Sequence, residues 1–156
     1  MSIRFYPTIV FCRESDWKEL EERVRSTTKE VVPCDVLKDP VMDHPSQPFD
    51  AILTTLCIEE TCTDFDSFKA NIQRLVGVLK PGGYLFIATM LGATFYKVRS
   101  QVIQTTPLTE EQVKEALTNA GLVVENESLY ESNTDDPIEK NESDFTHLSF
   151  ILAKKR

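Results

Sequence analysis

The chain has 156 residues, 41% of them hydrophobic and 27% charged. This composition excludes disordered and collagen-like proteins and predicts a single globular domain over residues 1–156. With 25 acidic against 17 basic side chains, the net charge of -8 argues against nucleic acid and anionic membrane surfaces as partners. Because the sequence shows neither a long apolar run nor signal-peptide features, we expect a cytoplasmic protein.

The cysteine spacing argues against a zinc site. Cys12, Cys34, Cys57 and Cys62 contain no C-x-x-C pair, and only two histidines are present. We therefore expect reduced thiols, most of them buried as small apolar groups, and no metal ion.

The first elements predicted are a helix and a short strand. Trp17, Leu20 and Val24 recur at helical spacing and favour a helix over residues 17–31. A β-branched cluster at 31–37 then predicts a strand, which leads into a loop containing three prolines.

A strand, a helix and a second strand are predicted in the middle of the chain. Residues 49–58 are almost continuously apolar or β-branched, as in a strand covered on both faces. Phe68, Ile72 and Leu75 lie on one face of a predicted helix over 65–79, which Thr63 or Asp64 can cap and Lys-Pro-Gly-Gly at 80–83 can stop. The next strand covers 84–89. This order predicts adjacent parallel strands with the helix crossing over between them.

The last third predicts a helix and two strands. Thr109 can cap a helix with Gln112 completing a capping box, and Gly121 marks its end. Strands at 122–130 and 147–153 are joined without a helix, so they can pair antiparallel at the sheet edge. The predicted fold class is α/β, with a mostly parallel sheet and a C-terminal antiparallel strand.

Candidate binding residues are sought at strand ends, because ligands of open α/β sheets bind outside the carboxyl ends of the strands. Asp35 could accept a hydrogen bond from an exocyclic amine such as that of adenine, with Val36 against the ring; alternatively, Asp35 caps loop amides. Tyr96 could line a cleft or could pack in the core or at an edge. The sequence lacks a Ser-His-Asp order, a Walker loop and an HExxH motif.

Residues 49–56, 65–79 and the Leu-Lys-Pro-Gly-Gly-Tyr-Leu sequence at 79–85 resemble the segment from the fourth to the fifth strand of class I S-adenosylmethionine-dependent methyltransferases. Proline prevents continuation of a helix, and the glycines allow a tight reversal into the central strand. The resemblance implies a Rossmann-like sheet.

A narrower resemblance covers nearly the whole chain. The motifs Cys-Asp-Val at 34–36, Leu-Thr-Thr-Leu-Cys at 53–57, Ala-Thr-Phe-Tyr at 93–96 and Thr-Thr-Pro-Leu at 105–108 are similar, in order and spacing, to the nicotinamide, phenylethanolamine and indolethylamine N-methyltransferase family.

That resemblance implies S-adenosylmethionine as cofactor and a small amine or pyridine as acceptor. The implied cofactor-binding residues are Asp35, Val36 and Thr55. The implied acceptor-binding residues are Thr89, Tyr96 and Thr105, and no catalytic side chain is implied.

Two features depart from the family. Thr89 stands where nicotinamide-specific members carry an acidic residue, and none of the five glycines forms a G-x-G pattern near the start of the chain. We therefore expect a chain that is truncated at its N-terminus relative to the family, that lacks the first two strands and that alone binds cofactor weakly. The leading interpretation is an N-methyltransferase; the alternative is a non-catalytic module that associates with itself or with a family member through an exposed sheet edge.

Overall fold

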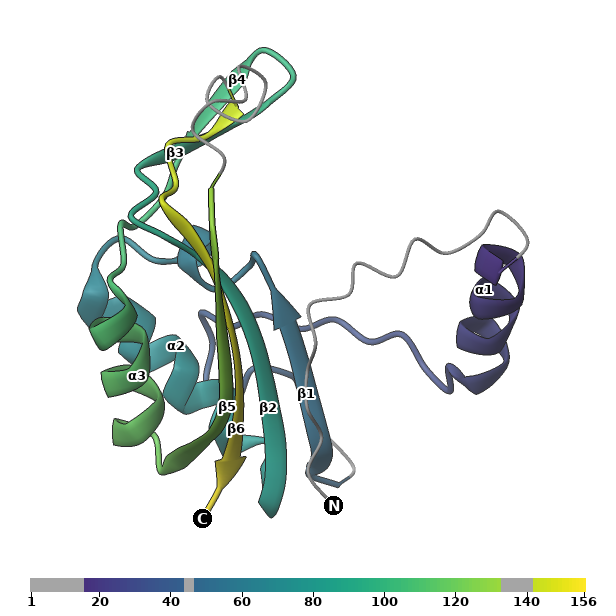
Figure 1. Ribbon diagram of the computed structural model, residues 1–156. Helices are drawn as coiled ribbons and strands as arrows, with labels where there is room; N and C mark the ends of the chain where they lie inside the picture. Colours follow the sequence, from purple (N-terminus) through teal and green to yellow (C-terminus); the bar gives the residue numbers. More distant parts are fainter. Residues whose placement is uncertain (1–15, 44–46, 133–141) are drawn as a thin grey trace. The chain divides into compact units, whose positions relative to one another are not determined.

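The structure is a computed structural model that describes residues 16–43, 47–132 and 142–156 (Figure 1). The chain divides into two compact units, Met1–Pro33 and Cys34–Arg156. The expectation of a single domain stays a prediction.

The first unit contains helix α1 (Asp16–Thr27), which confirms the predicted helix with an earlier end. Glu21 and Arg25 form an ion pair one turn apart, with 2.7 Å between Oε1 and Nη2. The strand predicted at 31–37 is wrong: residues 28–35 have no regular structure. A strand needs a partner for its backbone hydrogen bonds, none of the described strands pairs with this segment, and Pro33 has no N–H to donate.

The second unit is built on a four-stranded sheet in the order β1-β2-β6-β5. Its strands are β1 (Phe49–Thr55), β2 (Leu79–Leu91), β5 (Leu122–Glu131) and β6 (His147–Lys155). β1 and β2 are parallel, while β6 is antiparallel to both β2 and β5. Three strands therefore share one direction and the last strand opposes them, which confirms the predicted fold class and adds that β6 lies inside the sheet.

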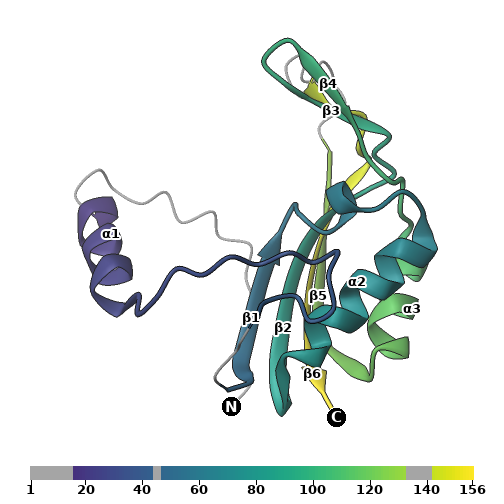
Figure 2. The ribbon, with the colours of Figure 1, turned by 180° about the vertical axis from the view of Figure 1, so that it is seen from behind.

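Helix α2 (Phe65–Gly77) connects β1 to β2, as predicted, and helix α3 (Glu110–Asn119) precedes β5. Both begin with a complete capping box, from Asp64 to Ser67 and from Thr109 to Gln112. Figures 1 and 2 show both helices on the same face of the sheet. The core lies between them and the strands, and Phe68, Ile72 and Leu75 are buried there, as predicted.

The Lys-Pro-Gly-Gly sequence does not stop α2, which ends at Gly77; it forms the beginning of β2 instead. The reason lies at Gly83, where a Cβ atom would come within 2.9 Å of the carbonyl oxygens of Asp50 and Lys80. The glycine therefore allows β2 to run close to β1.

Within the described residues of the second unit, no helix covers the other face of the sheet. Leu53 of β1 is 72% exposed, and Phe49 and Val123 are exposed as well. β1 also forms one edge of the sheet. Among the described residues, no helix is long and apolar enough to span a membrane.

Three short elements were not predicted. A 3-10 helix, η1 (Glu59–Thr61), follows β1, and strands β3 (Phe95–Val98) and β4 (Gln101–Gln104) form a hairpin after β2. The hairpin projects beyond the end of the sheet at which β1 terminates (Figure 1). Gly92, at φ +71°, has the left-handed backbone conformation that turns the chain from β2 towards the hairpin.

Candidate functional site

The candidate site begins where β1 ends. Thr55 is exposed and lies opposite Ala88 of β2. Leu56 then adopts φ +47°, an unfavourable conformation for leucine, while its N–H still donates to the Ala88 carbonyl at 2.8 Å. This turn directs the chain into η1 and brings two glutamates to the end of the sheet.

Glu59 is a buried carboxylate, with only 1% of its surface exposed. Its Oε1 accepts the N–H of Met90 at 3.0 Å, whereas Oε2 has no hydrogen-bond partner among the described residues. Burial raises the pKa of Glu59, and the Met90 N–H and the nearby Thr89 hydroxyl oppose that rise. The side chain is therefore fixed at one oxygen, while the other makes no well-formed hydrogen bond within the described residues.

Glu60 is half-buried, but both of its carboxylate oxygens are shielded from solvent and lack a hydrogen bond of good geometry within the described residues. Burial is the main cause that raises the pKa of Glu60 to about 7, and the neighbouring charge of Glu59 adds to it. The Thr105 hydroxyl and the Tyr96 phenol lie close enough to lower this pKa in part. Glu60 is therefore poised between its charged and neutral forms at neutral pH.

The three residues predicted to bind the acceptor converge on these glutamates. Thr89 of β2 is completely buried and interacts with Glu59, while Tyr96 and Thr105 interact with Glu60. Neither threonine hydroxyl makes a well-formed hydrogen bond among the described residues, although each lies close enough to its glutamate to lower the pKa of that carboxyl. The structure thus brings the three predicted residues together; their role in acceptor binding stays a prediction.

Backbone contacts hold this arrangement in place. The neighbouring Thr106 hydroxyl donates to the carbonyl of Cys62, just after η1, at 2.7 Å. The Thr105 N–H donates to the carbonyl of Thr94 at 3.0 Å. The loop that carries Thr105 is therefore tied both to the glutamate-bearing segment and to the beginning of the hairpin.

Asp144 fixes the approach to Tyr96. Its Oδ1 accepts the N–H groups of Thr94 at 2.7 Å and Phe95 at 3.2 Å, and Oδ2 accepts the Thr94 hydroxyl. Burial would raise the pKa of Asp144, but these hydrogen bonds outweigh it and lower the pKa. Ser143 adds a hydrogen bond to the Phe95 carbonyl at 2.9 Å. The segment before β6 thus anchors the strand that carries Tyr96.

The residues predicted to bind the cofactor lie on two segments. Asp35 is in a turn, where Oδ1 accepts the Leu37 N–H at 3.0 Å and Oδ2 pairs with Lys38 at 3.4 Å. This is the second of the two interpretations offered for Asp35, in which its carboxylate caps a loop amide. The carboxylate remains accessible, so a further hydrogen bond to a ligand is compatible with this geometry.

Val36 packs against the hydrophobic core, and its carbonyl accepts a hydrogen bond from Arg74. The thiols of Cys34 and Cys57 interact electrostatically, which indicates that the 34–36 turn lies near the segment that follows Thr55. The binding role of Asp35, Val36 and Thr55 stays a prediction.

The expectation that most cysteines are buried is wrong for Cys34 and Cys57, which are both exposed. It is confirmed for Cys62, which is buried. Cys34 precedes a surface turn and Cys57 follows the end of an edge strand, so neither is covered by the core. Cys12 lies outside the described residues.

Sequence reasoning missed Glu59 and Glu60. The strand-end rule drew attention to residues 54–56 but was not carried on to the two acidic residues a few positions later. Their position after a predicted strand was a usable signal. Their burial was not, because it depends on contacts with β2 and the 105–106 loop.

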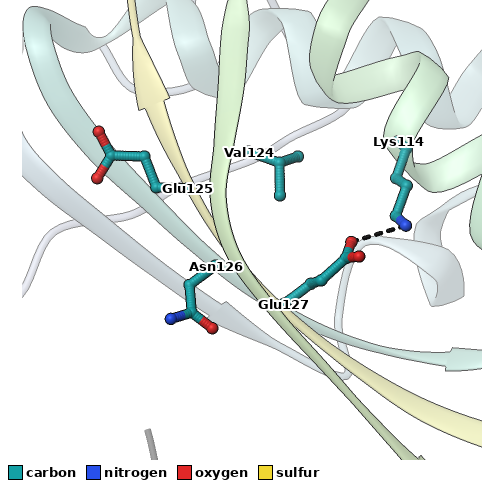
Figure 3. Close-up of a pocket in the computed structure, with 5 residues that line it drawn as sticks. All are labelled: Lys114, Val124, Glu125, Asn126 and Glu127. Carbon is teal, nitrogen blue, oxygen red and sulfur yellow. Dashed lines mark ion pairs between the residues drawn. The ribbon is translucent and has the colours of Figure 1, made fainter. Parts of the chain in front are cut away.

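A shallow hollow elsewhere on the second unit has a different character. It is lined by residues of α3 and β5: Lys114, Val124, Glu125, Asn126 and Glu127 (Figure 3). The Lys114 Nζ atom pairs with Glu127 at 2.7 Å and also with Glu110. Lys114 is therefore already paired with two glutamates, and none of the predicted site residues lies in this hollow.

Comparison with known proteins gives clear matches. Residues 8–156 match the NNMT/PNMT/TEMT family. The chain is 32% identical to human nicotinamide N-methyltransferase over 137 residues, which cover 87% of this chain and 52% of that protein. It is 37% identical to mouse indolethylamine N-methyltransferase over 111 residues, covering 70% and 42%. The chain thus spans about half the length of the curated relatives it matches.

Solved structures share the fold. An S-adenosylmethionine-dependent methyltransferase from Clostridium acetobutylicum matches with a TM-score of 0.57 at 14% identity, covering 92% of this chain and 72% of that one. The N-methyltransferase NodS from Bradyrhizobium japonicum WM9, in complex with S-adenosyl-L-homocysteine, matches with a TM-score of 0.53 at 14% identity, covering 92% and 63%. At these identities the likeness shows a methyltransferase fold, as expected.

Proposed function

This chain belongs to the NNMT/PNMT/TEMT family, and from that premise we propose that it serves S-adenosylmethionine-dependent methyl transfer to a nitrogen of a small amine or pyridine-like acceptor. One observation supports the proposal: beyond the carboxyl end of β1, Thr89 lies beside Glu59, and Tyr96 and Thr105 lie beside Glu60, in a cluster whose shielded polar atoms lack well-formed hydrogen bonds among the described residues. Uncommitted buried polar atoms favour a ligand that would complete their hydrogen bonds.

On the donor side, Asp35 would accept the exocyclic amine of adenine, Val36 would contact the ring and Thr55 would approach from the end of β1. S-adenosylmethionine supplies an electrophilic methyl group on a sulfonium. The protein's own contribution would be to hold an acceptor nitrogen in line with that methyl and to exclude water.

We expect weak donor binding by this chain alone. Its 156 residues contain no G-x-G sequence, so they offer no glycine-rich loop of that kind for close backbone approach to a cofactor. We also identify no carboxylate for the ribose hydroxyls. Two missing anchors of about 1.5 to 3 kcal/mol each correspond to a loss of a hundredfold or more in affinity.

Isothermal titration with S-adenosylmethionine, followed by a radiolabelled methyl-transfer assay on nicotinamide and simple aryl amines, tests the proposal. We expect saturable binding that is weakened in Asp35→Asn, which keeps an oxygen for the Leu37 N–H but removes the charge. Asp66→Asn, an exposed position on α2, is the matched control and should bind like the wild type. No saturable binding, or equal binding by Asp35→Asn, would contradict the donor assignment.

The alternative function is a non-catalytic module that associates with a second copy of itself. The supporting observation is the open edge of β1 together with the exposed Leu53. Light scattering of the purified chain tests it. A dimer that becomes a monomer in Leu53→Lys would support this function, whereas a monomeric wild type would exclude self-association.

A further inference from the structure

Two exposed thiols lie on segments of the second unit that are distant in sequence. Cys34 directly precedes the turn that carries Asp35, and Cys57 lies two residues beyond the end of β1. Both cysteines are free and exposed. Cys62 differs from them, because it is buried and its thiol donates to the Ile58 carbonyl at 2.9 Å. Among the cysteines that the structure describes, Cys34 and Cys57 are therefore the two that a reagent in solvent can reach.

The turn that follows Cys34 is held against α2 and the core. Val36 packs against the core, and its carbonyl accepts a hydrogen bond from Nη1 of Arg74, in the last turn of α2, at 3.4 Å. The Asp35 N–H donates to the carbonyl of the buried Val41 at 2.7 Å. These contacts keep Cys34 near the last turn of α2.

The segment that contains Cys57 is held by the same part of α2. Arg74 also donates to Oδ1 of Asn71 at 2.6 Å, and Nδ2 of Asn71 donates to the Thr61 hydroxyl at 3.0 Å. That hydroxyl donates to the carbonyl of Ile58, the residue after Cys57, at 2.8 Å. One continuous network of hydrogen bonds thus joins the two segments that carry the exposed thiols.

The two thiols also interact with each other. Burial is the main cause that raises the pKa of Cys57, and the negative charges of Glu59 and Cys34 add to it. Because such an interaction weakens with distance, it indicates independently that the two sulfur atoms lie near each other. Residues 28–33, which lead into Cys34, have no regular structure, so the backbone before this thiol is not fixed by a helix or a strand.

We propose that Cys34 and Cys57 form a reversible disulfide when a peroxide oxidises the chain, and that this bond fixes the 34–36 turn to the segment after β1. Formation of the bond does not depend on the proposed function, whereas its effect on donor binding rests on that function. Since both thiols are exposed, a soluble thiol can reach the bond and open it again by exchange.

The reaction balances with hydrogen peroxide as the oxidant. The Cys34 thiolate attacks one peroxide oxygen, so that an S–O bond forms and the O–O bond breaks; the hydroxide that leaves takes up the thiol proton as water. The Cys57 sulfur then attacks the Cys34 sulfur. The S–S bond forms, the S–O bond breaks, and the hydroxide leaves with the Cys57 proton as a second water. Cys34 reacts first because the raised pKa of Cys57 keeps that thiol protonated at neutral pH.

The disulfide would act on the proposed donor site. Asp35 and Val36 directly follow Cys34, and Thr55 lies two residues before Cys57. A disulfide holds its two residues at a short and fixed separation, so it would restrict the movement needed to admit an adenine ring. We therefore expect the oxidised chain to bind S-adenosylmethionine about tenfold more weakly than the reduced chain, or weaker still.

Peptide mapping by mass spectrometry tests the bond. The purified chain is treated with hydrogen peroxide, its remaining thiols are blocked with iodoacetamide, and it is then digested. Trypsin cleaves after a lysine between Cys34 and Cys57, and a glutamyl endopeptidase cleaves after the glutamates between Cys57 and Cys62. We expect a linked pair of peptides that contains Cys34 and Cys57, from a monomeric chain, and we expect dithiothreitol to separate it. Isothermal titration of the reduced and oxidised chains with S-adenosylmethionine tests the effect on donor binding.

Cys34→Ser should abolish the linked pair and make donor binding insensitive to peroxide. Cys12→Ser is the matched control, because it removes a cysteine that the proposed bond does not use, and it should keep both the linked pair and the peroxide effect. Cys57→Ser should match Cys34→Ser. Since Cys34 is exposed beside a turn, Cys34→Ser also covers the case in which Cys57→Ser does not fold.

Links between other pairs of cysteines, disulfide-linked dimers in place of the internal bond, or oxidation of both thiols to sulfinic acids without a link would overturn the proposal. A linked chain that binds the donor as tightly as the reduced chain would overturn the effect on binding. Failure of the proposed function is distinguishable, because neither form of the chain would then bind the donor although the link still forms.

Discussion

Two buried polar regions lie at the two ends of η1, and they differ in how completely their hydrogen bonds are formed. At one end, Asn71 of α2 is 0% exposed and fully paired. Its Nδ2 donates to the Thr61 hydroxyl at 3.0 Å and to the Cys62 sulfur at 3.4 Å, and its Oδ1 accepts from Arg74 at 2.6 Å. At the other end, carboxylate oxygens of Glu59 and Glu60 and the hydroxyls of Thr89 and Thr105 lack well-formed hydrogen bonds within the part of the chain that the structure describes.

The difference separates structure from function. A buried network whose members are all paired stabilises one packing, whereas unpaired groups reduce stability and are retained where a ligand completes them. The Asn71 region should therefore respond to substitution mainly through stability. The glutamate region should respond through binding and pH.

The largest effect on stability should come from the hydrophobic core next to the Asn71 region. Ile72→Ala removes a completely buried side chain next to Asn71 in α2 and should lower the free energy of unfolding by about 2 to 5 kcal/mol. Urea denaturation measures it. A loss below about 1 kcal/mol would contradict the packing of α2 against the sheet.

Asn71→Ala should cost about 2 to 3 kcal/mol, because it leaves the guanidinium of Arg74 and the hydroxyl of Thr61 without their partner. The same denaturation experiment measures this loss, and the loss should change little between pH 5 and pH 8. An unchanged stability would show that the network is dispensable.

Glu60→Gln should raise the free energy of unfolding at high pH, whereas the two preceding substitutions lower it. The pKa of Glu60 is raised from 4.5 to about 7 in the folded protein, so the native state binds an extra proton within that window and loses stability as the pH rises through it. With allowance for solvent screening, the substitution should remove about 1 to 2 kcal/mol of this loss. Unfolding of both proteins at pH 5 and pH 8 measures it; equal pH dependence would count against the raised pKa.

The smallest changes in stability are expected for two Thr→Val variants, one in each region, which form a matched pair. Thr89→Val replaces a buried hydroxyl, which makes no well-formed hydrogen bond among the described residues, with a methyl group of similar shape and should raise stability by up to about 1 kcal/mol. Thr61→Val makes the same chemical change in the paired region, breaking hydrogen bonds with Asn71 and the Ile58 carbonyl, and should lower stability by about 1 kcal/mol. Thermal denaturation of both variants compares them, and a shared sign would break the distinction between the regions.

Much of helix α2, which carries the Asn71 region, could be predicted from the sequence. The apolar spacing of Phe68, Ile72 and Leu75, the cap at Asp64 and the flanking apolar strands predicted the crossover and its buried face, because these signals are local and periodic. The capping box at Thr109 located α3 in the same way.

The candidate site was only partly predictable. Family motifs identified Thr89, Tyr96 and Thr105, which the structure brings together. The burial of Glu59 and the loss of solvent at Glu60 arise from segments distant in sequence, so no local pattern encodes them. The prediction of a strand at 31–37 was wrong for a related reason. Residues with high β-propensity form a strand only where a partner strand is available, and the described residues supply none for this segment.

The central claim is that the Glu60 carboxyl, shielded from solvent beside Glu59, takes up its proton far above its usual range, and the most direct test is its own titration. Carbon-detected NMR can follow the Glu60 carboxyl, assigned by its absence in Glu60→Gln. The account predicts a midpoint at about pH 7, because burial and the charge of Glu59 both favour the neutral form. A midpoint near 4.5 would contradict it.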